Sequence, residues 1–334
     1  MTSIRFAILG TAKIARTVAP KIQSAEGTEL LGIASRSEDS AQQFAQEFGI
    51  PRTYPGYAAA LDDPDVDAVY VPLPPSMHQE WTEKAAAAGK HILCEKPLAR
   101  NVSETDRMIA ACRKHNVVLL DGVMWYHTAR AAAIRSVVDS GQLGELRQLT
   151  SVFTFRWDTM PMENLRMHRD LGGGSLLDLG WYCVGASLWL LDDMPQRVYA
   201  RANWCNDVDI RLNGFLWFGD EGSVERKVAT IESGFDTVRR RWLEVAGTKE
   251  SLVCDDFTRP LKSSRPRFWT HDCDGESTEH VVTGKTQEEC MVESFCELIR
   301  SRQTDHPWLQ LSRKTQAVCD ALDRSARGGH VVEL

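Results

Sequence analysis

Short apolar runs alternate with amphipathic segments over residues 1–125, and this order restricts the fold of the 334-residue chain more than any other feature. Buried parallel strands read as short apolar runs, whereas the helices between them show a 3.6-residue period. The runs occur at residues 6–9, 30–34, 68–71, 91–94 and 117–120, with periodic segments at 14–22, 40–48, 79–88 and 103–114. Repeated strand–helix–strand order implies a parallel sheet. We therefore predict a doubly wound α/β domain over residues 1–125.

The pattern changes after a predicted helix at residues 131–140. Several later segments alternate apolar and polar residues or carry β-branched and aromatic residues, which is typical of strands: 146–157, 197–204, 210–218, 223–231 and 240–245. Turn signals at residues 219–222 and 246–249 separate some of them. We predict that residues 126–334 form an α+β domain with a large, mostly antiparallel sheet that is open on one face. Helices at 288–302 and 313–327 are expected to pack back on the body of the protein.

Charge and cysteine content exclude several classes of protein. The chain has 39 Lys and Arg against 46 Asp and Glu, a net charge of −7, which argues against a nucleic-acid partner. No apolar run approaches the roughly 18 residues of a membrane span, so no membrane partner is expected. Nine cysteines without a CxxC pair predict reduced thiols and no metal site. The amino terminus lacks the pattern of a secretory signal, which predicts a cytoplasmic protein.

A glycine-containing turn follows the first predicted strand. Dinucleotide-binding folds need a tight turn there and exposed amides at the start of the next helix. Gly10 fits the turn, Ala12 stands where the usual fingerprint has its second glycine, and Ala15 stands at the third position. The turn is weak evidence alone, but its place between strand and helix favours a nucleotide site. The predicted cofactor-binding residues in this segment are Gly10, Thr11, Ala12, Lys13 and Ile14.

The end of the second predicted strand bears on cofactor choice. An acidic residue there binds the ribose hydroxyl of NAD, whereas an arginine accommodates the 2′-phosphate of NADP. The strand ends in Ser35 and Arg36 without a carboxylate. We therefore predict that both residues bind the cofactor and that NADP is preferred over NAD. The alternative is that Arg36 is a solvated surface charge.

Two more polar segments follow strands of the same sheet, whose carboxyl ends are where ligands bind in open α/β folds. Pro72, Leu73, Pro74 and His78 follow one strand, and Glu95-Lys96-Pro97 follows the next. Pro72, Leu73, Pro74, His78, Glu95 and Lys96 are predicted to contact the cofactor. A charged pair where the chain leaves the core also makes Lys96 a candidate active-site lysine, although a plain salt bridge would explain either charge alone.

A glycine loop at residues 172–174 precedes a predicted helix on which Asp178 and Tyr182 are four residues apart and therefore share a face. Arg166 and His168 come just before this loop, and Trp125 follows the last strand of the first domain. Trp125, Arg166 and His168 are predicted to bind the substrate. The alternatives are that Arg166 and His168 are solvated loop charges and that Trp125 is a core residue.

The segments 10–15, Glu95-Lys96-Pro97 and 172–182 together resemble the glucose–fructose oxidoreductase/inositol dehydrogenase (Gfo/Idh/MocA) family over nearly the whole chain. Within it, the chain is most similar to dimeric dihydrodiol dehydrogenases and NADP-linked aldose dehydrogenases. The resemblance implies hydride transfer between a nicotinamide cofactor and a CH–OH carbon of a sugar, inositol or vicinal diol. It also implies that Lys96 and Tyr182 are the catalytic pair and that Asp178 orients the substrate or the lysine. Two departures concern the substrate pocket: Trp181 stands where a small residue is usual, and the run 126–129 is atypical.

Transfer of a hydride from an alcohol requires removal of the hydroxyl proton. A free tyrosine, with a pKa of about 10, is a poor base at neutral pH, but a nearby ammonium favours its phenolate. Either Tyr182 or Lys96 can therefore be the proton carrier. Two other functions remain open: a nucleotide-binding sensor without turnover, and a lyase or epimerase that uses a bound dinucleotide transiently.

The predicted open sheet face suggests self-association. Aromatic residues on an exposed face form a plausible association patch. The candidates for this patch are Phe153, Phe155, Trp157, Trp204 and Trp217. We therefore expect a homodimer formed through this face.

Overall fold

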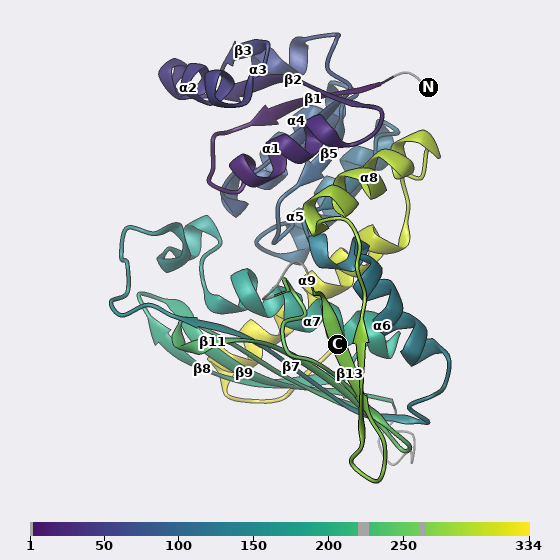
Figure 1. The fold of residues 1–334 in the computed structure, drawn as a ribbon. Coiled ribbons are helices and arrows are strands. Elements are labelled where there is room, and N and C mark those ends of the chain that lie inside the picture. Colours follow the sequence, from purple (N-terminus) through teal and green to yellow (C-terminus); the bar gives the residue numbers. More distant parts are fainter. Residues whose placement is uncertain (1–2, 220–226, 261–264) are drawn as a thin grey trace. The chain divides into compact units, whose positions relative to one another are not determined.

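The computed structural model describes residues 3–219, 227–260 and 265–334 (Figure 1). The chain folds into two compact units, one comprising residues up to 124 together with 286–310 and the other comprising 125–285 together with 311–334. The first unit therefore contains residues 286–310, a segment from the carboxy-terminal part of the chain.

The first unit is built on a six-stranded sheet with the order β3-β2-β1-β4-β5-β6, in which every pairing is parallel. Its strands are β1 (Ile4–Leu9), β2 (Thr28–Ser35), β3 (Arg52–Pro55), β4 (Ala68–Val71), β5 (His91–Cys94) and β6 (Leu119–Asp121). The connecting helices are α1 (Ala15–Ser24), α2 (Glu38–Phe48), α3 (Tyr57–Asp62), α4 (Pro75–Ala87) and α5 (Val102–Lys114). The predicted doubly wound parallel sheet is confirmed. Strand β3 and helix α3 were not predicted, because this short edge strand has no apolar run.

Helix α8 (Gln287–Arg300) belongs to the core of the first unit. Its Phe295 packs on Phe6 of β1, with ring centroids 5.9 Å apart and planes inclined by 60°. Met291 and Cys296 of the same helix are also buried in this core. The apolar face of α8 thus extends the layer formed by α1 on the parallel sheet.

The second unit is built on a nine-stranded sheet with the order β14-β13-β12-β11-β7-β10-β9-β8-β15, in which β7 and β10 pair in parallel and the other described strand pairs are antiparallel. Its strands are β7 (Leu146–Arg156), β8 (Arg197–Cys205), β9 (Val208–Phe218), β10 (Lys227–Gly234), β11 (Asp236–Gly247), β12 (Ser251–Cys254), β13 (Arg267–His271), β14 (Ser277–Val281) and β15 (Val332–Glu333). The predicted antiparallel sheet is confirmed. The start of the predicted strand 223–231 and most of the turn 219–222 lie outside the described residues.

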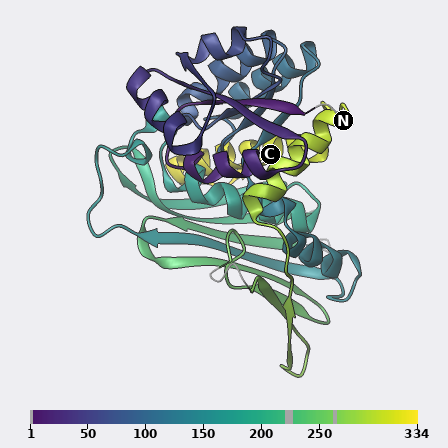
Figure 2. The same cartoon turned by 45° about the horizontal axis from the view of Figure 1, so that its top comes forward.

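Helices α6 (Ala129–Asp139), α7 (Trp181–Leu191) and α9 (Pro307–Gly328) lie against one face of this sheet, as the two ribbon views show (Figures 1 and 2). The stretch Arg169–Leu191, which includes α7, is long and apolar enough to cross a membrane by length and composition alone. In the structure 78% of its most apolar window is buried. Its side chains therefore supply the core of the second unit.

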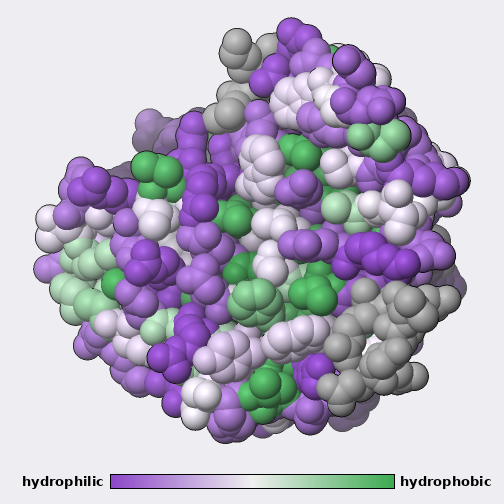
Figure 3. Space-filling view, turned by 90° about the horizontal axis from the view of Figure 1, so that it is seen from below, coloured by the Kyte–Doolittle hydropathy of each residue, from purple (hydrophilic) through white to green (hydrophobic). Residues whose placement is uncertain are grey.

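The other face of the nine-stranded sheet carries partly exposed aromatic residues. Neighbouring residues of a strand point to opposite faces, so Leu216 of β9 is fully buried while Phe215 is 45% exposed. In the same way, Trp242 of β11 is 38% exposed and its neighbour Leu243 is fully buried. Phe215 stacks on Trp217 with ring centroids 6.0 Å apart. Seen from below, the molecule shows apolar patches separated by polar residues (Figure 3).

The predicted composition of this open face needs a correction. Phe153 packs on Tyr182 of α7, with ring centroids 5.5 Å apart, so it lies on the helix-covered face. Phe155 shares this face because it is two residues further along β7, and both Phe155 and Trp157 pack on the buried Phe235. Trp204 is 37% exposed and lies under the Arg327 guanidinium.

Candidate active site

Gly10 forms the turn between β1 and α1. Its backbone has φ +113°, and a Cβ placed on it would lie 2.9 Å from Cδ2 of Leu73. Its N–H donates a 2.8 Å hydrogen bond to the Ala34 carbonyl of β2. Both the positive φ and the close approach of Leu73 require glycine, and the turn leaves the space over the carboxyl edge of the sheet open for a ligand.

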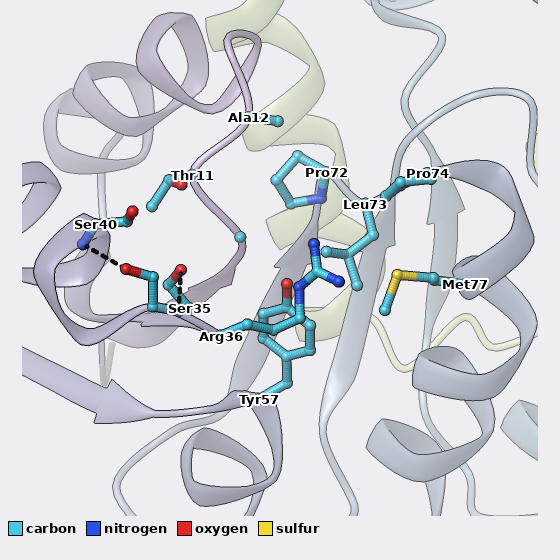
Figure 4. Close-up of a pocket in the computed structure, with 12 residues that line it drawn as sticks. Thr11, Ala12, Ser35, Arg36, Ser40, Tyr57, Pro72, Leu73, Pro74 and Met77 are labelled. Atoms are coloured by element: carbon cyan, nitrogen blue, oxygen red, sulfur yellow. Dashed lines mark hydrogen bonds between the residues drawn. The ribbon is translucent and has the colours of Figure 1, made fainter. Parts of the chain in front are cut away.

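A cavity of about 340 Å³ lies over this turn in the first unit (Figure 4). It is lined by Gly10, Thr11, Ala12, Ser35, Arg36, Ser37, Ser40, Tyr57, Pro72, Leu73, Pro74 and Met77. The lining thus brings together the glycine turn, the end of β2 and the segment after β4, as the sequence predicted. Other predicted cofactor-binding residues are not part of this lining: Lys13, Ile14, His78, Glu95 and Lys96.

The end of β2 gives the cavity a cationic and hydroxyl-rich wall. The Arg36 side chain is exposed and extends into the cavity (Figure 4). Ser37 is the N-cap of α2, and its hydroxyl oxygen accepts a 3.3 Å hydrogen bond from the Ser40 N–H. Guanidinium and hydroxyl groups are typical phosphate ligands. The lining contains no carboxylate, so these residues fit a dinucleotide with an additional phosphate on its adenosine ribose.

Sequence reasoning missed four residues of the lining. Ser37 and Ser40 carried a usable signal, because a serine before two acidic residues is typical of a helix start. Tyr57 could not be predicted, since it lies on α3, a six-residue helix behind an edge strand. Met77 lies in the first turn of α4, where its sequence context gives no ligand signal.

His78 connects the segments that follow β4 and β5. It is fully buried, with Nε2 2.7 Å from the Leu73 carbonyl oxygen and Nδ1 3.0 and 3.3 Å from those of Pro97 and Leu98. Burial lowers the pKa of His78, although these carbonyl oxygens oppose the shift. His78 therefore connects the backbone at Leu73, which lines the cavity, to the backbone just after Lys96.

Glu95 and Lys96 follow β5 directly. Glu95 is 8% exposed, and its carboxylate accepts a 2.7 Å hydrogen bond from the Tyr70 hydroxyl of β4. Burial raises the pKa of Glu95. A Cβ on Gly122, just after β6, would lie 3.0 Å from the Glu95 carboxyl group. Glu95 is thus an internal anchor, and the partly exposed Lys96 follows it at the carboxyl edge of three neighbouring strands.

The second unit brings Arg166, Asp178 and Tyr182 together. Arg166 binds Asp178 with two hydrogen bonds, 2.5 Å from Nε and 3.2 Å from Nη2, and the Asp178 side chain is only 12% exposed. The Asp178 charge raises the pKa of Arg166, and Arg166 also interacts electrostatically with Tyr182. Sequence reasoning had considered only Lys96 as the neighbouring cation.

The backbone at Asp178 differs from the predicted α-helix. Leu176–Gly180 form a π-helical turn that leads directly into α7. Such turns widen a helix locally and are frequent at functional sites. Asp178 lies in the π turn and Tyr182 lies in the first turn of α7.

The other two predicted substrate residues have different surroundings. His168 is partly exposed, and its carbonyl accepts a 2.9 Å hydrogen bond from the Gly173 N–H. Trp125 is 2% exposed and lies in an aromatic cluster with Tyr126, Trp189 and Phe257. Its buried indole N–H has no hydrogen-bond partner among the residues that the structure describes. Within the part of the chain that the structure describes, no cluster of His, Cys, Asp or Glu side chains is suited to a metal ion.

Comparison with known proteins places both units in one family. Residues 4–123 match the Gfo/Idh/MocA oxidoreductase family with an NAD-binding Rossmann fold, and residues 131–253 match the C-terminal domain of that family. The chain is 34% identical to a D-xylose 1-dehydrogenase (NADP(+)) of Haloferax volcanii, over 98% of this chain and 99% of that protein.

Two solved structures are similar over nearly the whole length. A 3-ketoreductase from Actinomadura kijaniata, crystallised with NADP and TDP-benzene, has a TM-score of 0.88 and 28% identity, covering 97% of this chain and 98% of its own. An aldose-aldose oxidoreductase from Caulobacter crescentus, complexed with glycerol, has a TM-score of 0.90 and 28% identity, covering 99% and 100%. The chain therefore belongs to the Gfo/Idh/MocA family of NAD(P)-binding oxidoreductases.

Proposed function

We propose that the protein is an NADP-preferring dehydrogenase or reductase that acts on a CH–OH carbon of a small polyhydroxylated substrate, such as a sugar, inositol or vicinal diol. The observation that carries this proposal is the arrangement of Arg166, Asp178 and Tyr182 in the second unit. It places a phenol within electrostatic reach of a hydrogen-bonded guanidinium–carboxylate pair, which is a constellation suited to moving a proton on a hydroxyl group.

NADP is the proposed cofactor, and the lining of the cavity over Gly10 supports it. Arg36, Ser37 and Ser40 would hold the ribose phosphate, and the Gly10 turn leaves room for the diphosphate. Glu95 and His78 would hold the backbone around this site without being part of the cavity lining. When bound, the nicotinamide accepts or donates the hydride.

Tyr182 is the proposed proton carrier, with Lys96 as a second cation that binds the substrate oxygen. The electrostatic interaction between Arg166 and Tyr182 supports this assignment, because a cation near a phenol favours loss of the phenolic proton. Asp178 is already bound by two hydrogen bonds from Arg166, so we assign it to orienting the substrate rather than to accepting the proton. Phe153 packs on the Tyr182 ring and restricts its position.

The proposed substrate class is supported by the relatives. The Haloferax volcanii protein is a D-xylose dehydrogenase, and a 3-reductase for a dTDP-linked deoxyglucose from Saccharopolyspora spinosa is 36% identical over 78% of this chain and 77% of its own. We propose that Arg166, His168 and Trp125 contact the substrate.

The protein is further proposed to be a cytoplasmic homodimer. Its nine cysteines are free thiols, as is usual in a reducing compartment. Phe215 and Trp242 on the open sheet face would be buried by a second copy.

The test is a screen of aldoses, inositols and vicinal diols with NADP⁺, followed by the near-ultraviolet absorbance of NADPH. We expect net NADPH formation with at least one substrate class, and a loss of more than about 100-fold in kcat for Tyr182→Phe. Tyr54→Phe is the matched control, because it removes a hydroxyl that hydrogen-bonds Asp63 and does not line the cavity. Full turnover in Tyr182→Phe would remove the catalytic assignment, and turnover without net NADPH would favour a lyase or epimerase.

A further inference from the structure

A buried carboxylate lies behind the residues of the second unit that are proposed to act on the substrate. Asp209, near the start of β9, is 7% exposed. Its Oδ2 accepts two hydrogen bonds of 2.7 Å, one from the Ser175 hydroxyl and one from the Leu176 backbone N–H. The Ser175 hydroxyl is also 2.9 Å from that of Ser233 on β10. Ser175 and Ser233 are both fully buried.

Asp209 thereby holds the beginning of the π turn. The first N–H groups of a helix have no partner within the helix, and a carboxylate beside them satisfies these donors and complements the helix dipole. Asp178 follows Ser175 by three residues, and Tyr182 follows it by seven. Fixing Ser175 and Leu176 to β9 therefore fixes where both side chains leave the backbone.

The same carboxylate packs against the glycine loop. A Cβ on Gly174 would lie 2.2 Å from Oδ1 of Asp209, and the Gly174 N–H donates a 2.9 Å hydrogen bond to the Arg166 carbonyl. Gly174 is therefore held between Asp209 and Arg166. The two ends of the Arg166–Asp178 pair are both connected to Asp209, one through the loop and the other through the π turn.

We propose that Asp209 is a positioning residue for the reaction, which sets the geometry of Asp178, Arg166 and Tyr182 through Gly174, Ser175 and Leu176 without touching the substrate. This inference rests on the proposed function, because the residues that Asp209 positions are the ones assigned to the chemistry there.

The surroundings of Asp209 make its role dependent on pH. Burial raises the pKa of Asp209 to about 7, although the hydrogen bonds from Ser175 and Leu176 lower it. The like charge of Asp323 on α9 raises this pKa further. Asp323 is itself paired with Arg169 at 3.2 Å, and Cys319 of α9 is a buried neutral thiol on the same side. Protonation of Asp209 weakens the two hydrogen bonds that its Oδ2 accepts from Ser175 and Leu176. Activity should therefore fall as the pH drops through about 7.

The experiment compares the wild type with Asp209→Asn and Ser175→Ala. Asp209→Asn keeps the shape of the side chain and removes its ionisation. We expect a folded protein with unchanged NADP binding, since the proposed cofactor residues lie in the other unit, and a kcat lowered about 10- to 100-fold by misplacement of the reacting groups. The acidic decline in kcat/KM should disappear in this variant.

Ser175→Ala keeps the carboxylate and removes one of its donors. The ionised form then loses a hydrogen bond, so the acidic decline should move to higher pH. Ser187→Ala is the matched control, because Ser187 is an equally buried serine of α7 whose hydroxyl donates to the Cys183 carbonyl at 2.9 Å, within the same helix. Its kcat and pH profile should equal those of the wild type.

A wild-type kcat and pH profile in Asp209→Asn would overturn the inference. If that variant does not fold, an unmoved acidic decline in Ser175→Ala would overturn it instead. Tyr182→Phe, measured in parallel, distinguishes a failure of the proposed function from a failure of the positioning role of Asp209. Full turnover in Tyr182→Phe contradicts the proposed function, whereas loss of turnover there with no effect of the Asp209 and Ser175 substitutions contradicts the positioning role alone.

Discussion

Arg36 and Arg166, the two arginines predicted to bind ligands, have different surroundings. Arg36 is exposed at the end of β2 and lines the cavity over Gly10. Arg166 is bound to Asp178 through two of its nitrogen atoms. An exposed arginine such as Arg36 can bind an anionic ligand, whereas a paired arginine such as Arg166 mainly orients the carboxylate of its partner.

Replacement of Arg36 tests the cofactor preference. Arg36→Ala should raise the KM for NADP about 10- to 100-fold, because a charge-assisted hydrogen bond contributes about 1.5–3 kcal/mol, and should leave the KM for NAD unchanged. The measurement is the ratio of kcat/KM for the two cofactors. Arg16→Ala is the control, since Arg16 lies over the Phe44 ring outside the cavity lining. An unchanged ratio in Arg36→Ala would contradict the assignment.

Substitutions of Arg166 and Asp178 should have non-additive effects on the free energy of unfolding. Removal of one partner leaves the other charge partly buried, so Arg166→Met and Asp178→Asn should each lower the free energy of unfolding by about 1–2 kcal/mol. The double variant should cost about 1 kcal/mol less than the sum of the two. Urea denaturation of the four proteins measures this coupling. If the losses of unfolding free energy in the two single variants simply add up in the double variant, the Arg166–Asp178 interaction does not stabilise the fold.

Single residues differ in how well the sequence predicted them. Gly10, Arg36 and Pro72 were identifiable because each follows an apolar run that reads as a strand of a parallel sheet. Asp209 had no such signal, since a carboxylate at the start of an antiparallel strand is usually exposed. Its burial depends on Ser175, which is 34 residues away in the chain.

At the scale of elements, the connection between the glycine loop and α7 was the feature that periodicity could not resolve. A spacing of four residues between Asp178 and Tyr182 is typical of an α-helix, yet Leu176–Gly180 form a π turn. The contacts that accompany this turn join distant segments, because Gly174 packs on Asp209 and Gly180 packs near Ser233. Local sequence patterns contain no information about such contacts.

The glycine loop gives a direct test of this packing. Gly174→Ala would place a methyl group 2.2 Å from Oδ1 of Asp209 at a φ of +108°. Gly275→Ala is the matched control, because Gly275 has a φ of +86° and nothing within 4 Å of its Cβ position. The control should cost about 1 kcal/mol from backbone strain alone, and Gly174→Ala about 1–3 kcal/mol more from overpacking. Equal unfolding free energies of the two variants would contradict the close packing.

At the scale of the whole molecule, the two sheet types were predictable and the division of the chain was less so. Short apolar runs indicated a parallel sheet, and alternation indicated an antiparallel one, because burial on both faces or on one face produces these patterns. The assignment of residues 286–310 to the first unit depends on contacts such as that between Phe295 and Phe6. These contacts join residues nearly the whole chain apart.

The open sheet face tests the proposed homodimer. Phe215→Asp should shift the protein from dimer to monomer, because it places a charge in a face that a second copy would bury. Met162→Asp is the control, since Met162 is 46% exposed against 45% for Phe215 and lies outside the sheet. Sedimentation at micromolar concentration distinguishes the two states. A monomeric wild type would contradict the dimer.

The central claim is that a hydride passes between NADP and a CH–OH carbon of the substrate, with net oxidation or reduction. The most direct measurement uses an aldose or diol deuterated at the reacting carbon, together with NADP⁺, and determines the mass of the reduced cofactor. Accumulating NADPH that carries the deuterium is the predicted result. Absence of deuterium from the cofactor with every substrate class, or its return to the sugar without net NADPH, would contradict the account.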